Sequence, residues 1–292
     1  MKIIITGKDS YIGNHIQQFI VDKAPDIEVQ QLDVIGDAWK SYDFTGCDTV
    51  IHVAAIVHRK DVSDWNLYRS VNTELPISIA EQAKKCGVKQ FVFLSTMAVY
   101  GVNKTLSRRK SVIRKGTVPA PNSMYGKSKY LAEVGLQKLA TDGFHVAIIR
   151  PPNVYGPQCR GGYITTYERI VRSFPVIPSA YTSVKQSVLF IDNLCSLVFQ
   201  LSRSGAGGIY MPQDFEPICA ADLMKAIADA IHLKRSRSSI LGLLVYPLCF
   251  LLIIRKGYGG VCYDSELSSF QGINYLGVST EEGVRRTVCC ES

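Results

Sequence analysis

The stretch KIIITGKDSYIGNHI, residues 2–16, decides the fold. Its isoleucines form a short β-branched run typical of a buried strand, and an apolar stretch with helical periodicity follows over Ile12–Asp22. Glycines between a strand and a helix let backbone N–H groups approach a pyrophosphate at the helix N-terminus. Serine stands where the usual pattern has its middle glycine, and it is small enough for such an approach. We therefore expect a phosphate-binding turn formed by Gly7, Ser10, Tyr11, Ile12 and Gly13.

Short apolar strands and longer amphipathic stretches alternate over the first half of the chain. After the opening strand and helix, the expected elements are Thr49–Val53, Val71–Cys86, Phe91–Ser95, Tyr125–Thr141 and Val146–Arg150. This alternation predicts an α/β fold, a Rossmann-like doubly wound parallel sheet with helices on both faces. We expect an NAD(P)-binding domain over 1–155, to which later strands can return, and mainly a small substrate-binding lobe over 156–292.

One aspartate closes the expected strand at Val29–Leu32. Asp33 is placed where a carboxylate binds the adenosine ribose and favours NAD over NADP. Only thirty-eight positions separate Gly13 from Ile51, which is a tight fit for two further βα units. If one unit is missing, the segment at Asp33 is instead the third strand. Asp33 or Asp37 would then lie near the adenine, and Lys8 could meet a 2′-phosphate.

The composition limits the class of protein. Nine scattered cysteines without a Cys-x-x-Cys pair suggest neither a disulfide framework nor a metal site, and with no export signal visible at the N-terminus they favour the cytoplasm. The net charge of +8 is spread along the chain without a nucleic-acid-binding motif, so an anionic small substrate accounts for it and no nucleic-acid partner is expected. His52 and His58 are interpreted as packing or loop residues.

The segment Ile240–Ile254 is apolar for fifteen residues and is flanked by basic residues. A membrane-spanning helix needs about 20 apolar residues, and Pro247 interrupts this segment. We therefore expect a buried or surface-lying helix and no transmembrane span.

Three residues carry the chemistry that the sequence suggests. Tyr125 and Lys129 lie four residues apart in YGKSK, on one face of a helix, and Thr96 follows an apolar strand in FLSTMAVYG. A tyrosine with an ordinary pKa near 10 needs a neighbouring cation to act as a base near neutral pH, and Lys129 is placed to supply it. Thr96 would share the hydrogen bond to the reacting hydroxyl.

At these residues the chain resembles the extended short-chain dehydrogenases/reductases, and within them the NAD-dependent epimerase/dehydratase family typified by UDP-galactose 4-epimerase. The landmarks occur in the family's order and cover nearly the whole chain: TGKDSYIG, VIHVAA, GVKQFVFLSTMAVYG, YGKSKYLAE, RPPNVYGP, SVLFIDNL and YLGVSTEEGVRRTV. The resemblance implies NAD, with NADP as the alternative, and a helix-paired homodimer.

The resemblance also implies binding residues. Ala54, Ala55 and Pro152 would line the cofactor together with Tyr125 and Lys129. A nucleotide-diphosphate sugar would contact Thr96, Asn153 and Gln186. The family often carries an arginine for a substrate phosphate where this chain has Gln186, so Lys185 or Arg160 is an alternative phosphate ligand.

The same comparison separates the reactions. Sugar 4,6-dehydratases of this kind place an aspartate and a glutamate after the threonine, whereas this chain has Met97 and Ala98. A nucleotide-sugar 4-epimerase acting on a UDP-hexose-type substrate, or an NAD(P)H-dependent 4-ketosugar reductase, needs only the threonine, tyrosine and lysine. A non-catalytic NAD(P)-binding protein is the third reading, and its expected mark is loss of the tyrosine or lysine.

Overall fold

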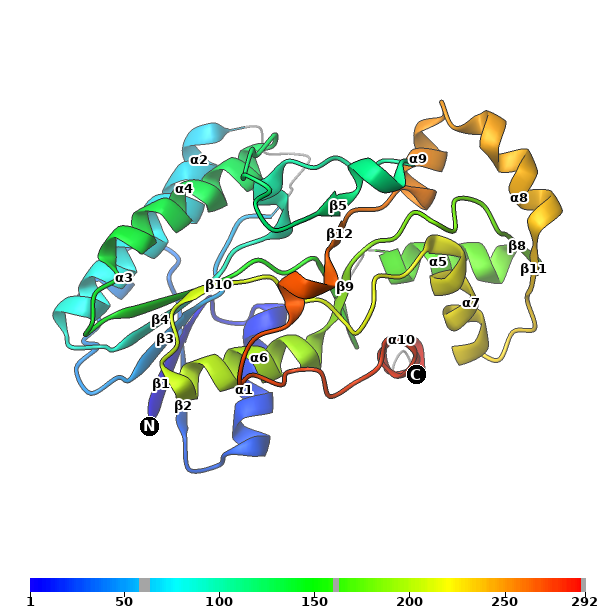
Figure 1. The fold of residues 1–292 in the computed structure, drawn as a ribbon. Coiled ribbons are helices and arrows are strands. Elements are labelled where there is room, and N and C mark those ends of the chain that lie inside the picture. The colour runs from blue at the N-terminus through cyan, green and yellow to red at the C-terminus, as the bar shows by residue number, and fades with distance from the viewer. Residues whose placement is uncertain (58–63, 160–162, 290–292) are drawn as a thin grey trace.

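A six-stranded parallel sheet forms the centre of the protein. The computed structural model describes residues 1–57, 64–159 and 163–289. The strands lie in the order β10-β6-β4-β3-β1-β2 (Figure 1). Their bounds are Lys2–Thr6 (β1), Glu28–Leu32 (β2), Thr49–His52 (β3), Gln90–Leu94 (β4), His145–Ile149 (β6) and Gly208–Tyr210 (β10). The expected α/β, Rossmann-like fold class is confirmed.

Alternating side chains of the first strand enter two different cores. Ile3 and Ile5 pack on the side of α1 (Tyr11–Lys23) and α6 (Ile191–Ser204), whereas Ile4 packs on the side of α3 (Leu75–Lys85) and α4 (Met124–Leu139). Successive strand residues point to opposite faces, so an uninterrupted apolar run suits a strand covered on both sides. The helices therefore form a layer on each face of the sheet (Figure 1).

The sheet contains one βα unit fewer than the doubly wound pattern. Only a short 3₁₀ helix, η1 (Ala38–Ser41), lies between β2 and β3, and both of these strands pair directly with β1. The missing unit anticipated from the chain length is confirmed. The reading of the Asp33 segment as the third strand is wrong, because β2 adjoins β1 and is the edge strand of the sheet.

The helix expected over Val71–Cys86 begins earlier, at Trp65. It consists of α2 (Trp65–Arg69), a π-helical turn η2 (Ser70–Glu74) and α3. Asp64 caps the first turn by accepting a hydrogen bond from the Asn66 N–H at 2.8 Å. Pro76 lies in the first turn of α3 and has no N–H to continue the helical hydrogen bonds. The π-helical turn η2 directly precedes α3.

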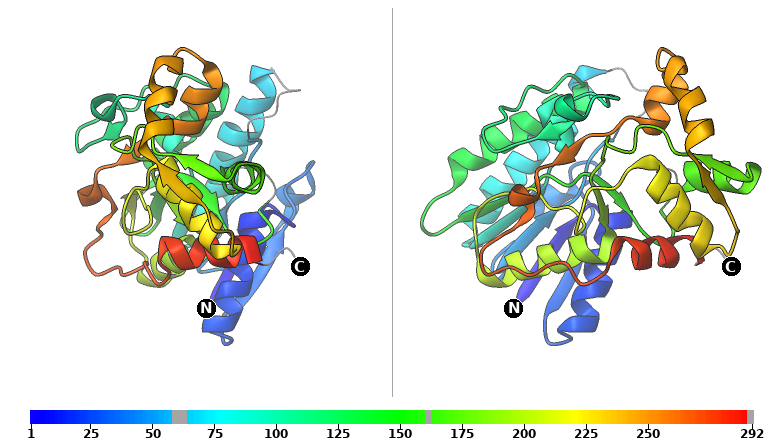
Figure 2. Two further views of the ribbon diagram at one scale, coloured as in Figure 1. Left: turned by 90° about the vertical axis from the view of Figure 1, so that its right-hand side faces the viewer. Right: turned by 45° about the vertical axis from the view of Figure 1, so that its right-hand side comes forward.

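The second half of the chain both completes the sheet and builds a lobe beside it. The strand β10 pairs with β6, and α6 packs on α1. The remaining helices gather at one end of the molecule (Figure 2). They are α5 (Tyr163–Ser173), α7 (Ala220–Ala230), α8 (Ser239–Val245), α9 (Leu252–Tyr258) and α10 (Thr280–Cys289).

Three pairs of short parallel strands hold this lobe to the sheet domain and to itself. The pairs are β7 (Asn153–Tyr155) with β9 (Val188–Phe190), β8 (Val176–Pro178) with β11 (Ser236–Ser238), and β5 (Val112–Ile113) with β12 (Cys262–Tyr263). The last of these pairs joins β5, in the first half of the chain, to β12, near its end. It therefore links two segments that are far apart in the sequence.

The apolar segment Ile240–Ile254 lies on the surface. It forms α8, a 3₁₀ turn η5 (Tyr246–Leu248) and the start of α9, and most of its large apolar side chains are exposed. Within the described residues, no helix is long and apolar enough to cross a membrane. The segment therefore forms several short helical pieces on the surface in place of one buried helix.

The two histidines set aside earlier have different outcomes. His52 is buried in the sheet, and its Nδ1 lies 2.7 Å from the Thr6 hydroxyl oxygen. Burial lowers the pKa of His52 to about 3, so the ring is neutral and acts in packing. His58 lies outside the described residues.

Candidate active site

Thr96 stands at the start of a 3₁₀ turn that follows β4. The turn, η3 (Met97–Tyr100), is capped by the Thr96 hydroxyl, which accepts a hydrogen bond from the Ala98 N–H at 3.1 Å. The Met97 N–H donates to the carbonyl of Pro151 at 2.9 Å, which ties the turn to the segment after β6. The position of Thr96 is therefore fixed from two neighbouring strands at the carboxyl edge of the sheet.

Tyr125 lies in the first turn of α4, directly against η3. Ser123 caps this helix by accepting from the Gly126 N–H at 3.1 Å. A Cβ on Gly126 would lie 2.6 Å from the carbonyl oxygen of Ala98, so only glycine permits this close approach. The approach brings the Thr96 hydroxyl close enough to Tyr125 to lower the pKa of the tyrosine, against the effect of burial.

We expect Gly126→Ala to reduce activity without unfolding the protein. The added methyl group must push α4 away from η3 and separate Tyr125 from Thr96. Displacing a catalytic group by about 1 Å can cost about 100-fold in rate, and kcat/KM measured by product formation should fall by about that factor. Gly143→Ala is the control, because its Cβ would meet nothing within 4 Å. Equal activity of the two variants would contradict this role of Gly126.

Lys129 lies one turn further along α4, beneath Tyr125. Its ammonium is buried, donates to the carbonyl of Leu94 at 2.7 Å and lies 4.5 Å from the centre of the Phe93 ring. Burial lowers the pKa of Lys129 to about 7, and the nearby carboxylate of Glu133 opposes this shift. Burial likewise raises the pKa of Tyr125 to about 12, with the Thr96 hydrogen bond opposing it. In this structure Tyr125 is accordingly protonated at neutral pH.

A buried ion pair holds α4 against the two strands that carry the site. Glu133 is 1 % exposed and accepts from Arg150 through Nε at 3.1 Å and Nη2 at 2.6 Å, while Ser95 donates its hydroxyl to the same carboxylate. Arg150 Nη1 also donates to the Tyr100 hydroxyl at 2.8 Å. Ser95 precedes Thr96, so this network fixes Thr96 and Lys129 relative to each other. No local pattern in the sequence indicates this network.

The glycine turn forms a bare backbone cradle at the same edge of the sheet. A Cβ on Gly7, whose φ is +101°, would lie 2.9 Å from the Ala54 nitrogen, and one on Gly13 would lie 2.6 Å from the Ser10 oxygen. Ser10 caps α1 by accepting from the Gly13 N–H at 3.2 Å. The turn is therefore packed too closely for a side chain at either glycine. It leads into the N-terminus of α1, and the N–H groups of a helix N-terminus suit a dinucleotide pyrophosphate.

The other residues expected at the cofactor follow several strands of the sheet at the same edge. Asp33 is exposed just beyond β2, and its carboxylate accepts from the Ile35 N–H at 2.9 Å. The buried hydroxyl of Tyr11 has no hydrogen-bond partner within the described ranges, and burial raises its pKa. Ile12, Ala54 and Ala55 are half-buried beside the turn, and Pro152 is buried after β6.

Asn72, which the sequence analysis did not single out, shapes the loop after β3. Its side chain accepts from the Ile56 N–H at 2.8 Å and donates to the Ile56 carbonyl at 2.9 Å. It also donates to the hydroxyl of Ser128 on α4 at 3.1 Å. The loop that carries Ala54 and Ala55 is thus tied directly to the helix of Tyr125 and Lys129. A polar residue in the middle of an amphipathic helix was the only signal in the sequence.

A cleft of about 360 Å³ lies on the lobe side of the site. Its wall includes three cations, Arg108, Arg114 and Lys185, and also Tyr263, whose ring contacts Tyr100 of η3. Two acids, Glu216 and Asp264, lie there as well. The cleft is therefore suited to an anionic group, and one residue of its wall, Tyr263, also contacts the η3 turn that follows Thr96.

The residues expected at the substrate are distributed unevenly around this cleft. Asn153 is exposed at the start of β7, but the side chain of Gln186 is buried near Tyr167, away from the cleft wall formed by its neighbour Lys185. Arg160 lies outside the described residues. Of the two phosphate ligands considered in place of an arginine, Lys185 is the one that lines the cleft.

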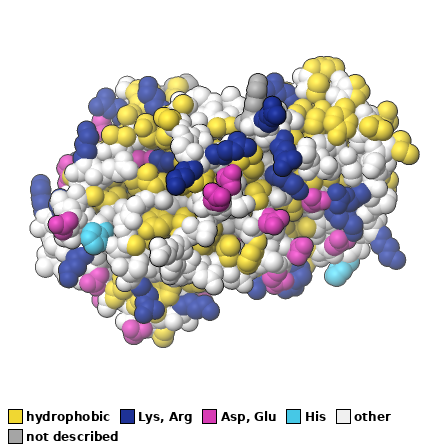
Figure 3. Space-filling view, in the orientation of Figure 1, with side chains coloured by type: hydrophobic (Ala, Val, Ile, Leu, Met, Phe, Trp, Pro, Cys, Tyr) yellow, Lys and Arg dark blue, Asp and Glu magenta, His cyan; other side chains and the backbone are white. Residues whose placement is uncertain are grey.

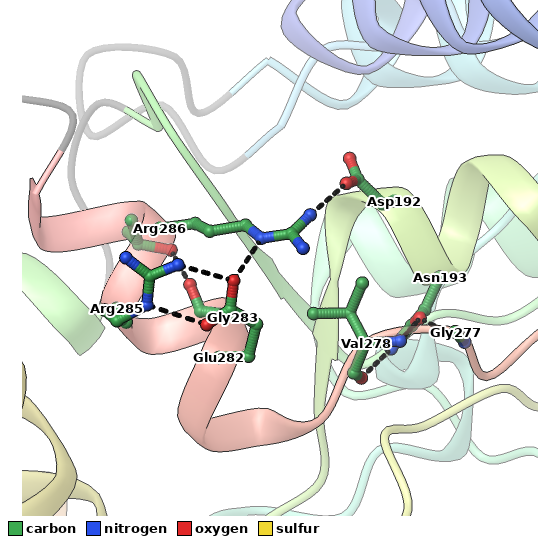
Figure 4. A network of polar contacts seen from close by, with 9 residues as sticks. Asp192, Asn193, Gly277, Val278, Glu282, Gly283, Arg285 and Arg286 are labelled. Carbon is green, nitrogen blue, oxygen red and sulfur yellow. Dashed lines mark hydrogen bonds and ion pairs between the residues drawn. The ribbon is translucent and has the colours of Figure 1, made fainter.

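Asp192 lies in the first turn of α6 and takes part in a network that reaches the last helix. It pairs with Arg286 of α10 at 3.3 Å, and Arg286 also contacts Glu282, as Figure 4 shows. The adjacent Asn193 donates to the Val278 carbonyl and accepts from the Gly277 N–H. These contacts fasten the last helix to α6, so Asp192 serves the fold.

Comparison with known proteins agrees with this geometry. Residues 3–174, more than half of the chain, match the NAD dependent epimerase/dehydratase family. The chain belongs to this family. Membership confirms the resemblance seen in the motifs, and the family's description names NAD as the cofactor.

Two relatives show how far the likeness extends. A UDP-glucose 4-epimerase of Vibrio cholerae is 28 % identical over 250 residues, covering 78 % of this chain and 75 % of the relative. An N-acetyl-α-D-glucosaminyl-diphospho-ditrans,octacis-undecaprenol 4-epimerase of Escherichia coli O157:H7 is 27 % identical over 290 residues, covering 94 % and 82 %.

Solved structures share the fold. The UDP-glucuronic acid 4-epimerase of Bacillus cereus, in complex with NAD, has a TM-score of 0.74 at 18 % identity and covers 99 % of this chain and 96 % of that one. A dTDP-4-dehydrorhamnose reductase of Clostridium acetobutylicum has a TM-score of 0.70 at 17 % identity, covering 99 % of each chain. At these identities the likeness establishes the fold alone.

Proposed function

We propose that this protein is a nucleotide-sugar 4-epimerase that acts on a UDP-hexose-type substrate with NAD. The observation that carries the proposal is the neighbouring hydroxyls of Thr96 and Tyr125, with Lys129 one helical turn deeper. All three lie at the carboxyl edge of the strands that also form the glycine cradle. This arrangement supports the proposal that Thr96, Tyr125 and Lys129 act together on one substrate.

In this proposal the two hydroxyls share one substrate proton. Thr96 positions the sugar 4-hydroxyl, and Tyr125 takes its proton as general base. Bound nicotinamide supplies the hydride acceptor for the hydrogen on the same carbon, which leaves a 4-keto sugar. Tyr125 would later return the proton to the oxygen on the same carbon of the sugar.

The ionisation of Tyr125 links the base role to the positive charge around it. With a pKa raised to about 12 by burial, Tyr125 needs a nearby cation to lose its proton at neutral pH. Lys129, whose own pKa is lowered to about 7, would contribute that charge and would hold the nicotinamide ribose. The cradle of Gly7 and Gly13 would hold the pyrophosphate.

The cleft supplies the substrate's anionic anchor in this proposal. Arg108, Arg114 and Lys185 can neutralise a diphosphate, while Tyr263 connects the cleft to the η3 turn. Asn153 would face the same diphosphate. Because the relatives act on sugars linked through a diphosphate to either a nucleoside or a polyprenol, both kinds of substrate belong in the trial.

A 4-ketosugar reductase is the second candidate. A protonated Tyr125 is ready to donate a proton to a keto oxygen, which is the acid role that such a reductase requires. A dTDP-4-dehydrorhamnose reductase also shares the fold. These observations support the reductase. They are also compatible with Tyr125 acting as a base, because that role depends on additional positive charge near its hydroxyl.

The nucleotide released from protein purified without added cofactor tests the two candidates. An epimerase regenerates its cofactor in every cycle, so we expect about one NAD per chain and C4 inversion of a UDP-hexose. Empty protein that binds NADPH and reduces a 4-keto sugar would instead establish the reductase. Cofactor binding without turnover of any diphosphate-linked sugar, by a folded protein, would contradict both and indicate a non-catalytic binding protein.

We also expect no loss of water from the substrate. Met97 and Ala98 follow Thr96 and carry no titratable group, so nothing at these positions can protonate a departing 6-hydroxyl. The two acids that could have replaced them, Glu133 and Asp192, are held in ion pairs with Arg150 and Arg286. Mass spectrometry of the product should show the substrate mass, and a 4-keto-6-deoxy sugar lighter by one water would contradict the assignment.

A further inference from the structure

The surface formed by residues 239–258 presents apolar side chains to solvent. Phe250 is 72 % exposed, Ile253 75 % and Leu243 66 %. Further large apolar side chains exposed on the same segment are Ile240, Leu241, Leu244, Tyr246, Leu248, Leu251 and Leu252. Figure 3 shows hydrophobic side chains gathered over the end of the molecule that carries α8 and α9. A patch of this kind marks an interaction surface, whereas isolated apolar residues on a surface do not.

The underside of this surface is firmly attached to the lobe. A Cβ on Gly242 would lie 2.4 Å from the Ser179 carbonyl oxygen, so α8 rests directly on the chain after β8. The rings of Tyr246 and Tyr181 lie 4.6 Å apart, and Tyr258 donates to the Pro178 carbonyl at 3.2 Å. The segment that carries the outward apolar face is therefore held firmly against the lobe.

Positive charge borders the apolar face. Lys234 precedes α8, and the exposed Arg255 and Lys256 lie in the last turn of α9. From Ile231 to Tyr263 the sequence has no aspartate or glutamate. The Lys256 carbonyl accepts a hydrogen bond from Lys104 at 3.4 Å, which adds a further cation beside the segment. Figure 3 shows Lys and Arg side chains next to the hydrophobic ones.

We propose that the surface formed by residues 239–258 docks on a membrane that contains anionic lipids. Its leucine, isoleucine and phenylalanine side chains enter the boundary between headgroups and acyl chains, and the bordering lysines and arginines meet the lipid phosphates. A second copy of the chain fits this surface less well. Two-fold pairing through the same patch would bring its basic border against an identical basic border, whereas anionic lipid complements it.

Docking in this way places the candidate cleft near the lipid headgroups. The chain runs from α9 through Gly260 into β12. The backbone N–H of Gly260 donates a hydrogen bond to the Thr105 carbonyl, and its own carbonyl accepts one from the Thr105 N–H. Cys262 and Tyr263 of β12 form part of the cleft wall. The membrane surface and the basic cleft are thus joined by a few residues of ordered chain.

Vesicle flotation of the full-length protein tests the docking surface. We expect the protein to float with phosphatidylcholine vesicles containing phosphatidylglycerol, to bind vesicles of phosphatidylcholine alone less, and to lose binding as salt is raised. Leu243→Ser/Phe250→Ser/Ile253→Ser should weaken the partition coefficient by about tenfold or more. The control, Val21→Ser/Val118→Ser/Phe174→Ser, removes three other exposed apolar side chains and should bind like the wild type.

The remaining outcomes are equally decisive. Thermal melting of both triple variants verifies that they fold, and sugar turnover in the absence of vesicles should be the same in both. Equal vesicle binding by the two triple variants would overturn the proposal, as would equal binding to neutral and anionic vesicles. If no vesicles bind and the wild type sediments as a dimer that the first triple variant abolishes, the patch is an interface between copies.

Discussion

Tyr125→Phe is expected to reduce kcat by about 100-fold to 10,000-fold, the range that one general acid or base contributes. The substitution removes only the hydroxyl that contacts Thr96 and leaves the ring in place against the start of α4. Cofactor affinity, measured by titration calorimetry, should stay within a few-fold of the wild-type value. The loss should appear in kcat and kcat/KM together, because the proton transfer occurs only in the transition state.

Tyr130→Phe provides the matched control for this experiment. Tyr130 lies on the same helix, half-buried against the small cluster around Tyr100 and Tyr263. Removing its hydroxyl changes the helix by the same atom but touches no residue of the proposed catalytic set. If Tyr125→Phe kept activity within a few-fold of Tyr130→Phe, the role of Tyr125 as acid and base would be refuted.

The second large effect is expected on stability, at the buried ion pair. Glu133→Gln keeps the shape of the side chain but leaves the guanidinium of Arg150, 5 % exposed, without its counter-ion. Removing one partner of such a pair costs about 3–5 kcal/mol in the free energy of unfolding. Chemical denaturation should show a lower midpoint with an unchanged slope.

A double variant separates the loss of charge pairing from the loss of packing. Glu133→Leu/Arg150→Met replaces both charges by apolar side chains of similar length, and it should recover much of the stability lost by Glu133→Gln, because no buried charge is left alone. Its activity should stay low if the pair also positions Thr96 through Ser95. A single variant within about 1 kcal/mol of the wild type would show that the pair does not hold α4 in place.

The sequence predicted the sheet, and it indicated Thr96, Tyr125 and Lys129 as the proposed catalytic residues, because both inferences depend on local signals. The apolar runs at 3–5 and 91–94 predict strands covered on both faces, and the spacing of Tyr125 and Lys129 predicts a shared helical face. The glycine turn was also predicted from a local signal, which is the placement of glycines between a strand and a helix. These elements lie where the periodicity placed them, with boundaries shifted by one or two residues.

The parts that the sequence did not reveal depend on contacts between distant segments. Arg150 and Glu133 are seventeen positions apart, and nothing in their local pattern shows that they meet under the site. Whether Gln186 or Lys185 faces the cleft depends on a half-turn of an extended segment, which only its pairing with Ile218 fixes. The length of the loop after β2 suggested a missing unit, but the neighbour of β2 could be known only from strand pairing.

That missing unit leaves the sheet with an open border at β2. Unpaired backbone groups on an edge strand can template pairing with another chain, and natural proteins counter this with polar and charged side chains. The sequence of β2, Glu-Val-Gln-Gln-Leu, is polar at three of its five positions, and Lys2 of β1 pairs with Glu28 at 3.1 Å. At this border, a few hydrophilic side chains therefore oppose fibril-like stacking of one copy on another. A longer relative of the fold would cover the same border with a further strand and helix.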